Sequence, residues 1–257
     1  PLLEVEKIEK VFQSRYSLFQ KSSSFQAVAP LSFSLYPKET LGLVGESGCG
    51  KSTLAKAIIY LDPPSGGKIY FKGNEINPKN KKMMSEIRKK IQFVFQDPYA
   101  SLHPLKTIGN AIREVLEYYS ENPKDDFNTL TNKLLEQVGL PSTFYSRYPH
   151  ELSGGQRQRV VIARALATRP ELLICDESVA ALDISVQAQI LNLLNELKEV
   201  LGLSYLFISH DLAVVKYMSD RIMVMQKGRL VELQEADAVY SRPKNKYTKK
   251  LISAIQT

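Results

Sequence analysis

The sequence predicts an α/β fold built on a largely parallel β-sheet, and three observations support this. Short apolar runs typical of strands alternate with helical segments over most of the 257 residues. A glycine-rich loop joins one such strand to a helix at residues 45–52. From about Pro98 to Ala167, by contrast, there is no convincing strand, and the apolar residues follow a helical period. We therefore expect a helical subdomain inserted into an α/β core.

The expected elements follow in chain order. Two strands are expected before the glycine-rich loop, at residues 3–11 and 31–35. Core strands are expected at residues 41–44, 69–71, 91–95, 172–176, 204–209 and 221–225, and core helices at 51–59, 187–200 and 212–218. In the helical interval, residues 108–119 and 130–138 are expected to be helices, a third helix begins near Gly155, and the breaks are Pro123, Pro141 and Pro149.

These elements define one domain over residues 1–257. Its α/β core is expected at residues 1–97 and 166–228, and the helical insert at 98–165. Residues 229–257 form a C-terminal extension with a short strand and one or two helices.

Composition narrows the class of protein. The chain is 44% hydrophobic and 24% charged, which is ordinary for a globular domain. No apolar run approaches the roughly 18–20 residues that a membrane span needs, and the first residues lack a signal-peptide layout, so we expect a cytosolic chain. The net charge of +7 suits nucleic acid, an anionic membrane surface or phosphate ligands, and discriminates poorly among them. The lysine clusters at 79–82 and 88–90 are most simply solvated faces.

The two cysteines, Cys49 and Cys175, both lie inside the candidate site motifs. Neither has a neighbour at a metal-ligand spacing, so we expect reduced thiols and no structural metal. Cys49 is either a small filler of its loop or a thiol open to alkylation.

The glycine-rich loop carries the strongest functional signal. Residues 45–52 read G-E-S-G-C-G-K-S and match the phosphate-binding pattern G-x-x-x-x-G-K-[ST] at every fixed position. Glycines let backbone N–H groups turn toward phosphate, Lys51 supplies a cation for the terminal phosphates, and the Ser52 hydroxyl is placed to hold Mg²⁺. A chance glycine-rich turn is the alternative, but it does not explain the flanking strand and helix. We expect a nucleoside triphosphate to be bound by Gly45, Glu46, Ser47, Gly48, Cys49, Gly50, Lys51, Ser52 and Thr53.

An acidic pair ends the apolar run 172–176. Asp176 is placed to hold Mg²⁺, and Glu177 to accept a proton from an attacking water. The alternative is an acidic turn at a strand end. His210 follows the apolar strand 204–209, where it is placed to bond a γ-phosphate or fix the attacking water. A helix-capping or exposed histidine is the alternative there.

Three aromatic residues before the loop are candidates for stacking on a nucleotide base. Tyr16, Phe19 and Phe25 lie among serine, glutamine and lysine residues. Each has the flat π surface that stacking needs, and each is equally well explained as an anchor of a loop.

A second glycine motif precedes the helix expected near Gly155. Residues 152–159 read L-S-G-G-Q-R-Q-R, so exposed N–H groups at a positive helix end make a second anion site. This stretch resembles the signature of the ATP-binding cassette (ABC) ATPases. The rest of that family's pattern is present in order: Gln96 resembles the Gln-loop residue, Asp183 the D-loop aspartate and His210 the switch histidine.

The resemblance implies a fold and a mechanism. The fold is a P-loop, RecA-like core with a mainly parallel sheet, an N-terminal antiparallel β subdomain and an inserted α-helical subdomain. The cofactors are ATP and Mg²⁺, the catalytic residues Glu177, His210, Gln96 and Lys51, and the Mg²⁺ ligands Ser52, Gln96 and Asp176. In this family two such domains pair head to tail, so the signature would act in trans through Ser153, Gly154, Gly155 and Gln156.

Finer motifs resemble the peptide and nickel importer branch, most closely the dipeptide/oligopeptide importer ATPases. They are residues 45–50, 95–102, 147–151, 183–189 and 208–215 and the pair Tyr247-Thr248. Three departures from the branch pattern are Ser178, Ala180-Ala181-Leu182-Asp183 and His103-Pro104-Leu105, and none removes a ligand. No cysteine follows Cys175, so the iron–sulfur cluster of some relatives is not expected.

The resemblance implies an energy-coupling ATPase at the cytoplasmic face of the inner membrane, peripheral to it. Its expected partners are two transmembrane permease subunits, a homologous second ATPase (a paralogue or a second copy) and, indirectly, a substrate-binding protein. A permease surface is expected near residues 97–120, where Tyr99, Leu102, Leu105 and Ile108 are either docking residues or core.

Two alternatives to peptide import are considered. Nickel or a metal chelate is the alternative cargo. A nucleic-acid-acting cassette is a remote alternative, because such proteins usually carry two fused cassettes or a long coiled coil, so no nucleic acid partner is expected.

Overall fold

The computed structural model describes residues 1–14, 23–122 and 124–254. Tyr16 and Phe19 lie outside the described residues. The chain divides into two compact units. We call Pro1–Arg88 with Ser204–Thr257 the outer unit, and Lys89–Leu203 the middle unit.

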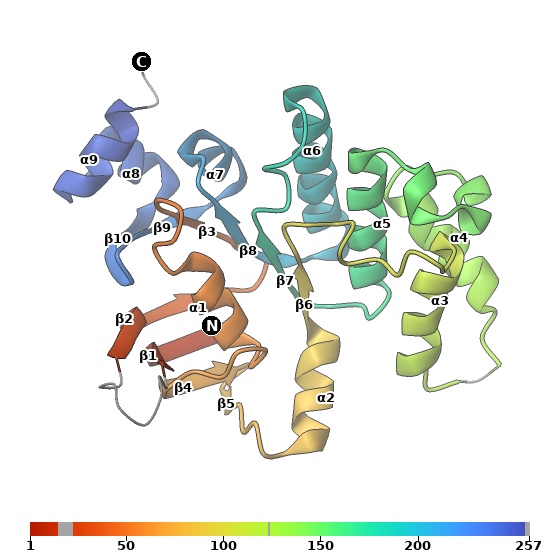
Figure 1. Cartoon of the computed structure of the whole chain (residues 1–257), viewed down its shortest axis with the longest axis horizontal. Coiled ribbons are helices and arrows are strands. Elements are labelled where there is room, and N and C mark those ends of the chain that lie inside the picture. The colour runs from red at the N-terminus through yellow and green to blue at the C-terminus, as the bar shows by residue number, and fades with distance from the viewer. Residues whose placement is uncertain (15–22, 123, 255–257) are drawn as a thin grey trace. The chain divides into compact units, whose positions relative to one another are not determined.

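An antiparallel sheet forms the first part of the outer unit. Its described strands are ordered β2-β1-β4-β5 (Figure 1). Their bounds are β1 Leu3–Ser14, β2 Ser23–Leu35, β4 Gly66–Phe71 and β5 Asn74–Glu75. Strand β2 is much longer than the predicted 31–35. At its far end Phe25 pairs with Phe12, and both side chains are largely exposed, so no buried face marked this part of the strand in the sequence.

The remaining strands of the outer unit make a mixed, mainly parallel arrangement. Strand β3 (Thr40–Val44) lies between β8 (Ser204–Ser209) and β9 (Arg221–Gln226) and is parallel to both. Every residue of β3 and β8 is buried, as expected for parallel strands covered on both faces. Strand β9 continues antiparallel into β10 (Arg229–Glu235). The helices of this unit include α1 Lys51–Ile58, α7 Leu212–Met218, α8 Ala236–Ser241 and α9 Lys246–Ser253.

The middle unit combines two parallel strands with a group of helices. Strand β6 (Ile91–Val94) runs parallel to β7 (Leu172–Asp176). Helices α3, α4 and α5 pack against one another, and α5 also packs on α6 (Figure 1). The helical bounds are α3 Ile108–Tyr119, α4 Phe127–Gln137, η1 Ser142–Ser146, η2 Pro149–Glu151, α5 Gly154–Leu166 and α6 Ile184–Leu201. Within the described part of residues 98–167 there is no strand, as predicted.

One helix was missed from the sequence. Helix α2 (Lys81–Lys90) takes in most of both lysine clusters, which we interpreted only as solvated faces. It buries Met84 and Ile87, and Asn80 starts it by accepting the Met83 N–H at 3.1 Å. Two buried residues give too weak an apolar stripe to stand out among the charged residues of this helix.

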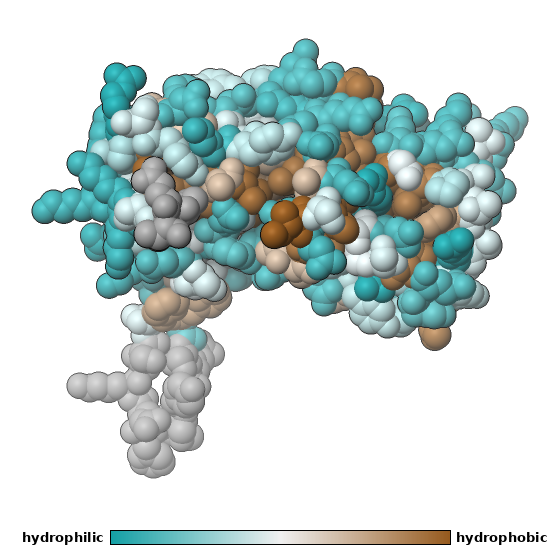
Figure 2. Space-filling model, turned by 90° about the horizontal axis from the view of Figure 1, so that it is seen from above, coloured by the Kyte–Doolittle hydropathy of each residue, from teal (hydrophilic) through white to brown (hydrophobic). Residues whose placement is uncertain are grey.

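One face of the molecule is shown by residue hydropathy in Figure 2. Hydrophilic residues cover most of the face drawn in Figure 2, with smaller apolar areas among them. No helix in the described ranges is both long and apolar enough to span a lipid bilayer.

Candidate functional site

The phosphate-binding loop connects β3 to α1 in the outer unit. Gly48 and Gly50 have φ angles of +76° and +106°, a region that side chains with a Cβ rarely adopt. A Cβ on Gly50 would lie 2.4 Å from the Ala27 carbonyl oxygen, and one on Gly45 would lie 2.2 Å from that of Met225. The loop backbone is therefore tightly packed against neighbouring backbone, and it leads into the start of α1. The first N–H groups of a helix have no partner within the helix.

Lys51 places a buried cation at the phosphate-binding loop. Its side chain is 4% exposed, and Nζ donates to the carbonyl oxygens of Gly45 at 2.7 Å and Glu46 at 3.1 Å. Ser52 follows it in the first turn of α1. A glycine cradle with a lysine held across it fits a triphosphate, since backbone N–H groups and one cation are the groups that bind such an anion.

Both cysteines are buried. Cys49 lies in the loop, 6% exposed, and burial raises its pKa despite the nearby Lys51. Burial raises the pKa of Cys175 to about 12. Thiolate is the reactive form, so Cys49 is a filler of the loop rather than a thiol poised for alkylation.

The acidic pair sits at the end of β7, beside the end of β6. In this parallel pair Val94 lies opposite Cys175, so two residues further on Gln96 falls opposite Glu177. The side chains meet there: Gln96 Nε2 donates to Glu177 Oε2 at 3.1 Å. The predicted Gln-loop residue and the predicted general base are thus brought together.

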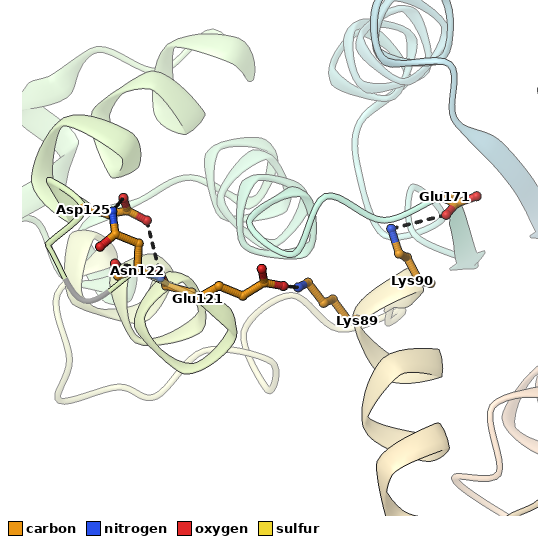
Figure 3. Close-up of polar contacts among 7 residues, drawn as sticks. Lys89, Lys90, Glu121, Asn122, Asp125 and Glu171 are labelled. Atoms are coloured by element: carbon orange, nitrogen blue, oxygen red, sulfur yellow. Dashed lines mark hydrogen bonds and ion pairs between the residues drawn. The ribbon is translucent and has the colours of Figure 1, made fainter.

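The start of the same strand pair is also held together. Just before β7, Glu171 donates its N–H to the Lys90 carbonyl at 2.8 Å, and its carboxylate pairs with Lys90 Nζ at 3.3 Å (Figure 3). Nearby, Lys89 pairs with Glu121 at 3.4 Å. The register of β6 on β7 is therefore supported at one end by Lys90 with Glu171 and at the other by Gln96 with Glu177.

Asp176 and Glu177 differ in environment. Asp176 is 5% exposed, whereas Glu177 is only partly buried. Glu177 has a left-handed backbone with φ +47°, which costs a residue with a Cβ about 1 kcal/mol or more. This turn ends the strand abruptly and sends the Glu177 side chain toward Gln96 rather than along β7.

The signature forms the start of α5. Ser153 is its N-cap, accepting the Gln156 N–H at 3.3 Å, while Gln156 accepts the Ser153 N–H at 3.0 Å. This reciprocal capping box fixes the backbone conformation at the first turn of α5, while Ser153 remains exposed. Gly155 is required by packing, because a Cβ there would lie 2.4 Å from Val186 Cγ1 on α6.

Three other predicted residues lie at exposed positions. Asp183 precedes α6, and His210 follows β8 in the outer unit. Phe25 is 65% exposed on β2. The outer unit thus holds residues 45–53 and His210, and the middle unit holds Gln96, Asp176, Glu177, Asp183 and the signature.

The residues predicted as Mg²⁺ ligands fit that ion by chemistry. Ser52, Gln96 and Asp176 offer hydroxyl, amide and carboxylate oxygens, and Mg²⁺ is usually bound by one or two carboxylates together with substrate phosphates. Among the described residues there is no group of three or more histidine, cysteine, aspartate or glutamate side chains arranged for a metal.

The permease candidates divide in two. Tyr99 is 50% exposed and Leu105 81% exposed, whereas Leu102 and Ile108 are buried core residues. Arg157, just after the signature glycines, lies over the Tyr99 ring at 5.5 Å and donates to the Leu152 carbonyl at 2.7 Å.

One contact at the phosphate loop was not foreseen. The Glu46 N–H donates to the Tyr247 hydroxyl, 201 residues away, at 3.1 Å. In the sequence, the Tyr247-Thr248 pair indicated only the resemblance to the importer branch and no contact with this loop.

Comparison with known proteins identifies the family. A family model described as "ABC transporter" matches residues 28–180. The chain is 49% identical, over 99% of its length, to the oligopeptide transport ATP-binding protein AppF of Bacillus subtilis strain 168, of which it covers 78%. It is 44% identical over 99% of its length to the dipeptide transport ATP-binding protein DppF of Haemophilus influenzae, again covering 78%.

A solved structure has a similar fold. The dimeric ATP-binding cassette MJ0796, in a post-hydrolysis state bound to ADP and phosphate, matches with a TM-score of 0.79 and 27% identity, over 91% of this chain and 98% of that one. Its likeness agrees with the predicted cassette fold, an antiparallel β subdomain with a mixed, mainly parallel sheet and helices. The family match and the near full-length identities show that this chain belongs to the ABC transporter family, as one of its ATP-binding proteins.

Proposed function

We propose that this chain is the ATP-hydrolysing, energy-coupling subunit of a bacterial importer for dipeptides or oligopeptides. The observation that carries the hydrolytic part is the Gln96–Glu177 hydrogen bond, which holds a carboxylate at a strand end next to a buried aspartate. The peptide cargo rests on the relatives, whose names assign them to oligopeptide and dipeptide transport.

The phosphate loop binds ATP in this proposal. Backbone N–H groups of the loop, apart from that of Glu46, which donates to the Tyr247 hydroxyl, surround the phosphates, and Lys51 exchanges its bonds to the Gly45 and Glu46 carbonyls for bonds to phosphate oxygens. The buried ammonium then offsets charge on the terminal phosphates where water is scarce. Ser52, Gln96 and Asp176 would hold Mg²⁺, which neutralises phosphate charge when bound.

Glu177 is the general base. Its carboxylate, oriented by Gln96, accepts a proton from the water that attacks the γ-phosphorus, and the bond to the leaving ADP oxygen breaks. The products are ADP and inorganic phosphate. His210, exposed at the end of β8, bonds the γ-phosphate or fixes the water.

A second ATPase subunit completes the site. Ser153, Gly154, Gly155 and Gln156 act in trans on the partner's ATP through the exposed start of α5, and Asp183 lies in the same pairing surface. Since ATP carries more charge than one half neutralises, its binding favours the closed pair. The relative MJ0796 is a dimer in its solved structure.

Two permease subunits receive the coupled motion at the cytoplasmic face of the inner membrane. Of the four candidate docking residues, Tyr99 and Leu105 are exposed and therefore accessible to a partner.

Purification from native membranes tests the proposal. The subunit should co-purify with two permeases, a second ATPase and a peptide-binding protein, identified by mass spectrometry. The binding protein's ligand should be a short peptide. If the binding protein instead carries nickel or a metal chelate, the transport assignment stands but the cargo is that metal and not a peptide. Recovery with soluble proteins or nucleic acid alone would overturn the transport assignment.

A further inference from the structure

The C-terminal part of the outer unit contacts the phosphate loop at two backbone groups. Tyr247 on α9 accepts the Glu46 N–H at 3.1 Å. At the other end of the loop, Gly228 in the β9–β10 turn donates its N–H to the Cys49 carbonyl at 2.9 Å. Residues remote in the sequence thus hold both sides of the segment 46–49.

The position of Tyr247 is itself fixed by a chain of hydrogen bonds. Asn245 caps α9 by accepting the Tyr247 N–H at 2.8 Å. The carboxylate of Glu232 on β10, 7% exposed, accepts the N–H groups of Lys244 at 2.9 Å and Asn245 at 3.0 Å. These links run from β10 through the start of α9 to the loop.

Glu232 is suited to this role as a charged acceptor. Burial works against its ionisation, but the hydrogen bonds that it accepts, that from the Lys244 N–H first among them, together outweigh burial and hold its pKa below the ordinary value. It therefore remains a carboxylate near neutral pH, and bonds to a charged acceptor are stronger than neutral ones. Tyr247 is 6% exposed, and burial raises its pKa still further above neutral pH, so its hydroxyl stays protonated.

We propose that Tyr247 is a positioning residue for ATP binding, which presets the phosphate loop through the Glu46 N–H. Its role goes beyond the proposed peptide import, since it concerns nucleotide binding by this chain alone. A loop held in its binding geometry before ATP arrives has less conformational entropy to lose when ATP binds. The Tyr247-Thr248 pair gains a function in this way, through a contact that the sequence does not reveal.

The substitution Tyr247→Phe isolates the hydroxyl. The ring and its packing stay, while the acceptor for Glu46 is lost. We expect the Kd of a fluorescent ATP analogue for the full chain to rise about three- to tenfold, the effect of losing one hydrogen bond, with kcat at saturating ATP unchanged. Amide exchange at Glu46 should accelerate in the same variant.

Tyr240→Phe is the matched control. Tyr240 lies on α8 of the same extension, and its buried hydroxyl has no hydrogen-bond partner among the described residues. This change should leave the Kd within about twofold of wild type, since no hydrogen bond is lost. If Tyr247→Phe binds the ATP analogue as wild type does, the positioning role is wrong.

A second variant covers the case in which Tyr247→Phe does not fold. Asn245→Ala removes the α9 cap, and it should also raise the Kd for the ATP analogue. Where both single variants fold, the double variant should lose less binding free energy than the two single losses added together. Full additivity of the two losses, or an unchanged Kd for Asn245→Ala, would contradict the proposal that the start of α9 positions Tyr247 for the loop. Because only nucleotide binding is measured, failure of the peptide-import proposal would leave these results unaffected.

Discussion

At the residue scale, Glu177 combines a left-handed backbone with a carboxylate that is hydrogen-bonded to Gln96. A residue in the left-handed region is strained, and such strain persists only where the surroundings fix it. Here the buried strand β7 precedes it, and Gln96 bonds its carboxylate. The strained turn separates two adjacent acids, so that buried Asp176 and more exposed Glu177 have different environments and can have different roles.

The substitution Glu177→Gln tests the base assignment. Glutamine keeps the size and can still bond Gln96, but it does not take up a proton from water. We expect ATP to bind with near wild-type affinity while kcat falls about 10²- to 10⁴-fold, the usual contribution of a general base. The closed pair with the second ATPase should accumulate in the presence of ATP.

Glu136→Gln provides the control, since Glu136 is an exposed carboxylate on α4 in the same unit. Its turnover should equal that of wild type. Turnover of Glu177→Gln at the wild-type rate would show that another group is the base.

The sequence predicted candidate residues for the site but not the hydrogen bond between Gln96 and Glu177. The phosphate loop was recognisable because its pattern is local, with glycines, lysine and serine at fixed spacing. The Gln96–Glu177 bond depends on the register of β6 on β7, and its partners are 81 residues apart. No local pattern encodes that register.

At the element scale, the signature helix is held by close packing as well as by its cap. Helices α5 and α6 approach so closely at Gly155 that only a glycine fits against Val186. Gly154 has more room, because a Cβ there would lie 3.2 Å from its nearest neighbour, the flexible end of Leu182. The two signature glycines therefore meet different demands.

Gly155→Ala should destabilise the protein. Its Cβ would overlap Val186 Cγ1, and overpacking of this kind costs about 1–3 kcal/mol, which for a chain of this length lowers the Tm by roughly 2–4 °C per kcal/mol. Adding Val186→Ala to Gly155→Ala should restore part of the loss, as differential scanning calorimetry can measure.

Gly154→Ala is the comparison, and it should lower the Tm less. Equal losses for the two glycine variants, with no recovery in the Gly155→Ala/Val186→Ala double variant, would contradict the packing explanation.

Elements with a strong apolar period were predicted well, and weakly patterned ones were not. Helix α3 begins and ends at the predicted residues, because its buried face is regular and Thr107 caps it. Helix α2 and the far end of β2, at residues 24–26, bury little, so tertiary pairing rather than local pattern defines them. The α/β class itself followed from the alternation of buried strands and helices.

At the scale of the whole molecule, long-range contacts turn a local motif into a working site. The phosphate loop is complete by sequence within residues 45–52, yet its backbone lies close against Ala27 on β2 and is hydrogen-bonded by Gly228 and Tyr247. The net charge of +7 had suggested several classes of partner and decided none. Family membership rests instead on motifs and similarity along the chain.

The most direct test of the central claim is the rate of ATP hydrolysis by the assembled transporter in proteoliposomes, with and without its binding protein loaded with a short peptide. We predict that the loaded binding protein increases the rate several-fold and that the complex with Glu177→Gln in this subunit hydrolyses far more slowly. A rate that does not respond to any peptide-loaded binding protein, while nickel or a metal chelate stimulates it, would contradict peptide import as the function of this chain.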